Sequence, residues 1–143
     1  MRIRGSCLCG NVRFEIDQAI GPFELCHCRR CRKMSGAAAL PAVGVNVEDY
    51  TFLSGREFVK TYAAPILHQP PAYHSMFCSN CGSPVPPPDP TGDWIEIAAG
   101  LFDDDVGLKP DKHIFVEHVP DWDEIEGSLP RYTRRELYKL RTG

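Results

Sequence analysis

The segment CHCRRCRKMSG, from Cys26 to Gly36, places three cysteines within six residues. Zinc in a structural site takes four ligands in a tetrahedron, whereas a catalytic zinc keeps three protein ligands and one open position. No fourth cysteine stands beside these three in the sequence. What completes the site therefore depends on how the chain uses its other cysteines.

The other four cysteines form two short pairs. Cys7 and Cys9 make a C-x-C motif, and Cys78 and Cys81 make a C-x-x-C motif that a glycine follows. Either these four form one closed site, or one outer pair completes the central group and leaves an unsupported remainder. We favour the first division because it leaves no cysteine over. The long loop between the pairs does not forbid it, since closure costs only about 0.6 kcal/mol per doubling of loop length and structural zinc contributes roughly 10 kcal/mol or more.

The central group is then a three-cysteine site whose fourth position is open. If residues 26–28 are extended, Cys26 and Cys28 share a face and His27 points away from it. Water or an incoming thiol is therefore the expected fourth ligand. The more distant candidate ligands, each better explained as an ordinary surface or core histidine, are His68, His74, His113 and His118.

Basic residues surround the three-cysteine segment. Their positive charge lowers the pKa of neighbouring thiols and attracts a carboxylate-bearing substrate. The alternative is that several of them are simply solvated. A substrate thiol in the open position of a zinc site would lose its proton and become a nucleophile for an aldehyde carbon. The basic residues are Arg29, Arg30, Arg32 and Lys33.

Composition limits the possible classes of protein. The chain has 143 residues, the size of one domain with an adequate core, and a formal net charge of -3, which argues against a broad nucleic-acid footprint. The start MRIRGSCLCG lacks the apolar region of a signal peptide, and no run is long enough to span a bilayer. Seven cysteines is an odd number, which does not favour a secreted disulfide framework. We therefore expect a cytoplasmic location, where clustered cysteines more often bind metal.

Short strand patterns separated by turn residues predict a mostly β fold. In the clearest pattern, Val12, Phe14 and Ile16 alternate with charged residues, as in a half-buried strand. Further strands are expected within residues 23–28, 38–47, 50–55, 56–62, 72–78, 94–100 and 113–118. Short helices are expected within residues 31–38, 121–126 and 133–140, and a loop over the proline-dense residues 83–93.

The chain resembles the glutathione-dependent formaldehyde-activating enzyme (GFA) family, also called the centromere protein V type. The motifs that carry the resemblance are GSCLCGNVRFEI, CHCRRCRKMSGA, FCSNCGSP, AAGLFDD and HIFVEHVPDWDEIEGSLPRY, which follow in order along nearly the whole chain. The resemblance implies an Mss4-like fold of short antiparallel strands stapled by zinc, with residues 1–143 as one domain. It also implies a structural zinc on Cys7, Cys9, Cys78 and Cys81, and a second, exchangeable zinc on Cys26, Cys28 and Cys31.

The same resemblance implies a carbon–sulfur lyase that forms or cleaves S-(hydroxymethyl)glutathione, with a small thiol such as glutathione and a small aldehyde such as formaldehyde as partners. The alternatives are a non-catalytic glutathione carrier and a zinc-stabilised binding module. A dithiol redox protein is the weakest alternative, because its C-x-x-C usually begins a helix in a βαβ unit. His74 and His113 are the acid–base candidates, and Ser35 is a candidate hydrogen-bond donor. Residues Pro86–Pro90 match no feature of the family.

Overall fold

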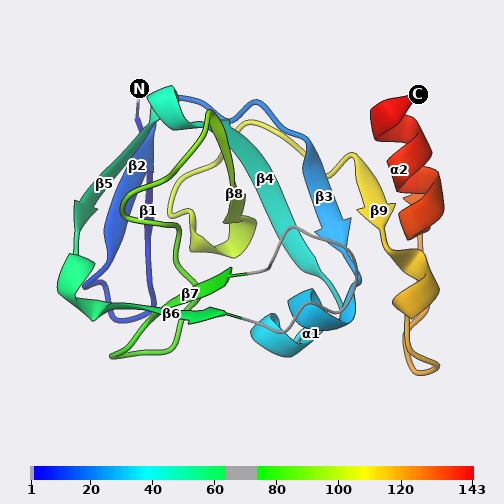
Figure 1. The fold of residues 1–143 in the computed structure, drawn as a ribbon, viewed down its shortest axis with the longest axis horizontal. Helices are drawn as coiled ribbons and strands as arrows, with labels where there is room; N and C mark the ends of the chain where they lie inside the picture. The colour runs from blue at the N-terminus through cyan, green and yellow to red at the C-terminus, as the bar shows by residue number, and fades with distance from the viewer. Residues whose placement is uncertain (1, 64–73) are drawn as a thin grey trace.

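The fold comes from a computed structural model that describes residues 2–63 and 74–143 (Figure 1). The described residues form two α-helices, α1 (Arg29–Ser35) and α2 (Arg134–Thr142), and ten short strands. The strands are β1 (Ile3–Ser6), β2 (Arg13–Ile16), β3 (Phe23–Cys26), β4 (Leu40–Asn46), β5 (Tyr50–Ser54), β6 (Val59–Ala63), β7 (His74–Cys78), β8 (Trp94–Ala98), β9 (Lys112–Ile114) and β10 (Arg131–Tyr132). This confirms the predicted mostly β class with few short helices.

The strands form three sheets, ordered β1-β2-β5, β10-β9-β3-β4-β8 and β6-β7. In Figure 1 the three-stranded sheet lies on the left, the larger sheet on the right, and the β6–β7 hairpin lies below them. Most pairs are antiparallel, but β9 pairs in parallel with both β3 and β10. These two parallel pairs were not foreseen, because strands 23–26 and 112–114 are joined by a long connection whose path the sequence pattern does not give.

The main core lies between the faces of the two larger sheets. Phe14 and Ile16 of β2 are at most 1% exposed, which confirms the alternation seen in the sequence. Ile97 of β8 stands opposite Val43 in the β4 register and is equally buried. The ring of Phe14 fills the space above Gly5, where a built Cβ would lie 2.2 Å from the ring. Gly5 is therefore the residue that lets β1 approach the core.

Several elements differ in extent from the sequence-based expectation. The expected strand over 113–118 ends at Ile114, because Phe115 has a left-handed backbone (φ 58°) and begins a single 3-10 turn. The expected helix over 121–126 is only a turn, held by the Asp123 N–H that donates to the Pro120 carbonyl. The helix near residue 31 begins earlier, at Arg29, and the first two residues of the expected strand 72–78 lie outside the described residues.

Helix α2 begins with a complete capping box. The Glu136 N–H donates to Thr133 Oγ1, and the Thr133 N–H donates to the Glu136 carboxylate. This reciprocal pair satisfies the first free N–H groups of the helix and fixes its start. Neither described helix is long and apolar enough to cross a membrane.

Candidate metal centres and cavity

The three cysteines of the central motif come together at the point where β3 becomes α1. Cys26 is the last residue of β3, Cys28 is the N-cap of α1, and Cys31 lies in the first helical turn. The Cys31 N–H donates to Cys28 Sγ over 3.4 Å. As a result the three Sγ atoms lie within 4.8 Å of one another, and no histidine of the described residues joins them.

Hydrogen bonding among these sulfur atoms shifts the pKa values of the three thiols in opposite directions. Contacts with Cys26 and Cys31 lower the pKa of the Cys28 thiol, with help from backbone N–H groups at the helix start. The same sulfur contacts and burial raise the pKa of Cys31. Metal ligation needs thiolates, so a bound cation would take the place of the protons that these sulfurs share. The donor set of soft sulfur atoms suits zinc.

The ring of His27 is directed to a second histidine instead of the sulfurs. His27 Nε2 lies 2.9 Å from His113 Nδ1, and both side chains are buried. The His27 backbone N–H donates to the Ile114 carbonyl, which ties the turn after β3 to β9. Burial is the main cause that lowers the pKa of both imidazoles, so they favour the neutral form. His113 does not line the cavity described below, whereas His118 does.

Only some of the other residues predicted for the site line the cavity. Ser35 Oγ donates to the Cys31 carbonyl at 2.7 Å and accepts from the Ala37 N–H, so this hydroxyl closes the end of α1. Arg32 Nε donates to the His27 carbonyl at 3.4 Å. Neither Arg32 nor Lys33 lines the cavity, whereas Arg29 and Arg30 do. His68 and the side chain of His74 lie outside the described part of the chain.

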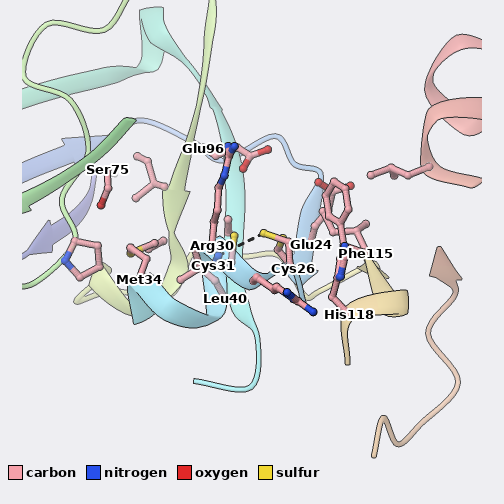
Figure 2. A pocket seen from close by; sticks show the side chains of 18 of the residues that line it. Glu24, Cys26, Arg30, Cys31, Met34, Leu40, Ser75, Glu96, Phe115 and His118 are labelled. Atoms are coloured by element: carbon pink, nitrogen blue, oxygen red, sulfur yellow. Dashed lines mark hydrogen bonds between the residues drawn. The ribbon is translucent and has the colours of Figure 1, made fainter. Parts of the chain in front are cut away.

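The three-cysteine group lies in the wall of a cavity of about 980 Å³ (Figure 2). One face of the five-stranded sheet forms its floor. Cys26 stands opposite Leu40, and Glu24, two residues earlier on β3, stands opposite Ala42. Ala42 in turn pairs with Ala98 of β8. Because these alanine side chains are short, the sheet face between the cysteines and the far end of β8 is hollow.

Two other segments form part of the walls, and the sequence did not connect either of them with the site. The proline-dense loop contributes residues 84–87, which overlap at Pro86 and Pro87 with the segment Pro86–Pro90 that carries no motif of the family resemblance. Helix α2 contributes Leu137, which is 3% exposed and packs in one cluster with Cys26, Cys31 and Ile114. In sequence, Leu137 reads only as an apolar residue in a short basic helix, so no signal could have assigned it to the site.

A buried carboxylate anchors α2 to the cavity floor. Glu24 is 4% exposed and accepts from Arg141 through both oxygens, at 2.8 and 2.9 Å. Lys112 Nζ lies 3.1 Å from the same carboxylate. Two cations therefore neutralise Glu24, as a buried charge requires. The ion pair between Arg141 and Glu24 also holds the last turn of α2 against β3, and Lys112 adds β9 to the same contact.

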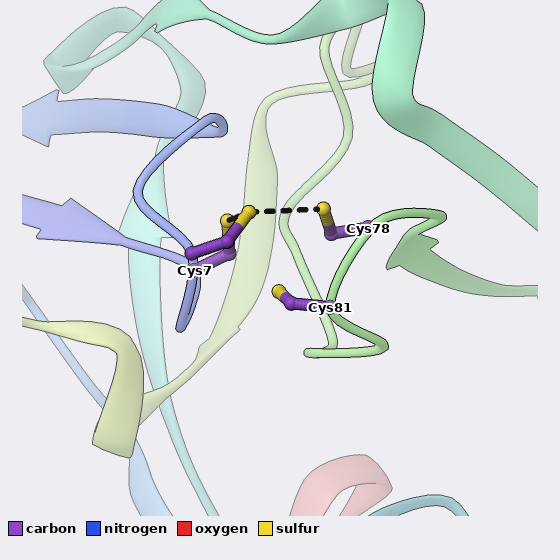
Figure 3. Close-up of side chains that lie close together, drawn as sticks. Cys7, Cys78 and Cys81 are labelled. Atoms are coloured by element: carbon purple, nitrogen blue, oxygen red, sulfur yellow. Dashed lines mark hydrogen bonds between the residues drawn. The ribbon is translucent and has the colours of Figure 1, made fainter.

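The second sulfur group joins two turns that are far apart in sequence. Its members are Cys7, Cys9, Cys78 and Cys81. In each turn the N–H of a glycine donates to the carbonyl of the first cysteine: Gly10 to Cys7 at 3.0 Å, and Gly82 to Cys78 at 2.7 Å. Both glycines have left-handed φ values, 80° and 81°, which only glycine adopts without strain. The two turns thus present their sulfurs to each other in the same way (Figure 3).

The distances within this group suit a zinc ion. All four Sγ atoms lie within 4.8 Å of one another. The Cys7–Cys9 and Cys9–Cys78 sulfur separations are 3.5 and 3.8 Å. A tetrahedral ion with zinc–sulfur bonds of about 2.3 Å would separate its ligands by about 3.8 Å. All four cysteines are free thiols, so no disulfide competes with metal binding.

Protein groups pack against the buried cysteines of the four-cysteine site. Val12 is fully buried beside it and donates its N–H to Cys7 Sγ at 3.3 Å. A hydrogen bond with Ser83 lowers the pKa of Cys81 to about 5, whereas burial raises that of Cys78 to about 11. Cys7, Val12 and Cys78 belong to one hydrophobic cluster. This group therefore reaches from the core, through Cys7 and Cys78, to the surface at the exposed Cys9, whereas the three-cysteine group opens onto a cavity.

Comparisons with known proteins agree on one family. The model of the family "Glutathione-dependent formaldehyde-activating enzyme" matches residues 2–118. A Halomonas elongata protein named "Putative glutathione-dependent formaldehyde-activating enzyme" is 35% identical over 133 residues, which cover 88% of this chain and 82% of that protein. A crystal structure of a Rhodobacter sphaeroides protein has a TM-score of 0.53 and 19% identity, covering 91% of this chain and 99% of the other, which shows likeness of fold alone. All seven cysteines fall within the matched residues, whereas α2 lies beyond them.

Proposed function

The chain belongs to the glutathione-dependent formaldehyde-activating enzyme family, and from that premise we propose that it forms and cleaves the carbon–sulfur bond of S-(hydroxymethyl)glutathione. Its substrates are then glutathione, or a similar small thiol, and formaldehyde. The observation that carries the proposal is the group of three cysteines in the wall of a large cavity. Three soft ligands beside an accessible space leave room for a substrate sulfur.

Two metal roles follow from the two environments. Cys7, Cys9, Cys78 and Cys81 would hold a structural zinc, and Cys26, Cys28 and Cys31 would hold an exchangeable one. When bound to the three cysteines, zinc supplies the positive charge that turns a substrate thiol into a thiolate near neutral pH. The free thiols of the chain suit a reducing compartment, so the proposal includes a cytoplasmic location.

The chain's own residues position the substrate. Arg29 and Arg30 begin α1 beside the cysteines and line the cavity. A guanidinium can hold a carboxylate through two parallel hydrogen bonds, which suits a thiol that carries carboxylates. Leu40, Ile114 and Leu137 line the cavity near Cys26 and exclude water from the reacting atoms. Exclusion of water strengthens the electrostatic contacts made there.

The reaction needs no oxidant or reductant. The thiolate sulfur attacks the aldehyde carbon and forms the carbon–sulfur bond, while the carbonyl π electron pair moves to the oxygen. That oxygen takes a proton, which balances the proton that the thiol gave to solvent. Cleavage is the reverse, with the electron pair of the carbon–sulfur bond returning to sulfur.

Exchange at equilibrium tests this function directly. With ¹³C-labelled formaldehyde and glutathione, NMR exchange spectroscopy measures how fast label moves between free formaldehyde and the hydroxymethyl adduct. We expect the zinc-loaded protein to raise this rate above the protein-free rate, and Cys28→Ser to return it to that rate. The far-UV circular dichroism of Cys28→Ser should match that of wild type, which checks that the loss of exchange does not come from unfolding. Tight glutathione binding with no gain in exchange rate would contradict the lyase and favour the glutathione carrier.

A further inference from the structure

The cavity holds two carboxylates with different surroundings. Glu24 is neutralised by Arg141 and Lys112. Glu96 of β8 also lines the cavity (Figure 2), but among the described residues it forms no ion pair within 4.0 Å and no hydrogen bond. Its side chain is accessible within the cavity. Glu96 thus presents to whatever occupies this space a carboxylate that has no ion-pair partner among the described residues.

The environment of Glu96 is unfavourable for a charge without a partner. The side chain is exposed to the cavity, but the protein around it partly desolvates the carboxylate, which is the main cause that raises its pKa, followed by the negative charge of Glu24. Arg141 acts in the opposite direction and favours the ionised form. A cationic group of a ligand would supply the missing partner and restore the interactions that the carboxylate has lost with water.

Strand register fixes where Glu96 stands relative to the cysteines. Cys26 pairs with Leu40 at one end of β4. Gly44, farther along β4, pairs with Glu96 of the next strand. With about 3.3 Å per residue along a strand and 4.8 Å between strands, the Cα atoms of Cys26 and Glu96 are roughly 16 Å apart. Glu96 therefore stands too far away to exchange a proton with atoms that react at the sulfur site, but it can bind the far end of an extended ligand.

We propose that Glu96 is a specificity-determining residue that binds the ammonium group of the substrate thiol. This inference rests on the proposed function, because it assumes a thiol whose sulfur reaches the three-cysteine site. A tripeptide-length ligand spans roughly 10 Å when extended, which matches the separation that remains after the reach of the two side chains. Free cysteine is too short, since only two carbon atoms separate its sulfur from its ammonium nitrogen.

Helix α2 supports this role indirectly. Arg141 neutralises Glu24 and favours ionised Glu96, and it comes from the segment beyond the residues that the family model matches. Without Arg141, Glu24 would keep Lys112 as its cation, but the positive charge that favours ionised Glu96 would be lost. Because the C-terminal helix supplies a cation to Glu24, Glu96 is the one of these two carboxylates that can pair with a cationic group of a ligand.

The test compares two ligands on two proteins by calorimetry. Zinc-loaded wild type and Glu96→Gln are titrated with glutathione and with N-acetylglutathione, which keeps the thiol and both carboxylates but lacks the ammonium group. We expect Glu96→Gln to weaken glutathione binding at least about tenfold, as loss of a charge-assisted contact does. Wild type should bind N-acetylglutathione more weakly by a similar factor, and Glu96→Gln should weaken that ligand no further. Glu126→Gln, an exposed carboxylate outside the cavity, is the matched control and should bind as wild type.

Each other outcome overturns the inference in a distinct way. Equal binding of glutathione by wild type and Glu96→Gln overturns the role of Glu96 and leaves the proposed function standing. Equal weakening of both ligands in Glu96→Gln shows a structural effect and overturns ammonium recognition. If zinc-loaded wild type binds neither thiol at millimolar concentration, the proposed function fails together with the inference. Metal content and thermal midpoint, measured for every variant, identify misfolded protein.

Discussion

The two cysteine groups use the same ligand atoms in opposite surroundings. The four-cysteine group brings four sulfur atoms together, and its buried members Cys7 and Cys78 lie in a hydrophobic cluster with Val12 and Val85. The three-cysteine group has a strand end and a helix start on one side and a cavity on the other. In the roles proposed above, the chain supplies all four ligands of the first group and the metal stabilises the fold, whereas the second group leaves its fourth position to a substrate.

Removal of a ligand from the closed group should have the largest effect. We expect Cys78→Ser to lose the structural metal and to unfold or aggregate, because metal binding of about 10 kcal/mol or more is coupled to folding. Cys78 is fully buried, so a hydroxyl there also lacks a partner. Thermal unfolding and metal quantitation measure the effect. A Cys78→Ser protein with the wild-type thermal midpoint would show that the four cysteines do not stabilise the fold.

The same substitution in the open group should abolish activity and keep the fold. Serine is itself a favourable N-cap, so Cys28→Ser should retain the start of α1 while the second metal is lost. We expect one metal ion per chain, a thermal midpoint within a few degrees of wild type, and exchange at the protein-free rate. If Cys28→Ser instead removes the more tightly held metal, the two roles have been assigned in reverse.

The basic residues of α1 should contribute to glutathione binding only where they line the cavity. Arg29 lines the cavity and Lys33 does not. We expect Arg29→Ala to weaken glutathione binding about tenfold, since a carboxylate loses a charge-assisted partner. Binding should also weaken as salt is raised. Lys33→Ala is the matched control on the same helix, and equal effects of the two variants would show that only the overall charge matters. Metal content should stay constant in both.

Loss of the ion pair that anchors α2 should have the smallest effect on the stability of the protein. Arg141→Ala removes one of two cations from Glu24, and Lys112 remains. Because Arg141 is about half exposed, with 49% of its side chain accessible, we expect a loss of about 1 kcal/mol in the free energy of unfolding. Chemical denaturation measures this change. A loss as large as that of Cys78→Ser would show that α2, and not the four-cysteine group, dominates stability.

Much of the fold could be predicted from sequence because its signals are local. The alternation of Val12, Phe14 and Ile16 predicts a half-buried strand, and the structure buries all three. The three cysteine motifs are local too, and their count favours a division into four and three; the sulfur atoms gather in those two groups, although the two outer pairs are far apart in sequence. Short-range patterns of this kind depend on residues that are close in the chain.

The cavity depends on contacts that no local pattern contains. Glu24 reads as one charged residue in a strand, yet its partner Arg141 is 117 residues away. Glu96 reaches the cavity because of the register between β4 and β8, and Leu137 reaches it because the terminal helix packs against the cysteines. The left-handed Phe115, which ends β9, also has no sequence signal, since bulky residues rarely adopt positive φ. The cysteines could thus be identified in advance, but the cavity around them could not.

Stepwise removal of metal tests the contrast between the two groups most directly. Zinc-loaded protein is treated with a series of chelators of increasing affinity for zinc. Metal in the protein fraction and far-UV circular dichroism are measured at each step. We predict two zinc ions per chain at the start, loss of the first with the fold intact and with loss of glutathione binding, and loss of the second together with cooperative unfolding. Unfolding that accompanies the first metal lost, or release of both metals in one step, would contradict the account.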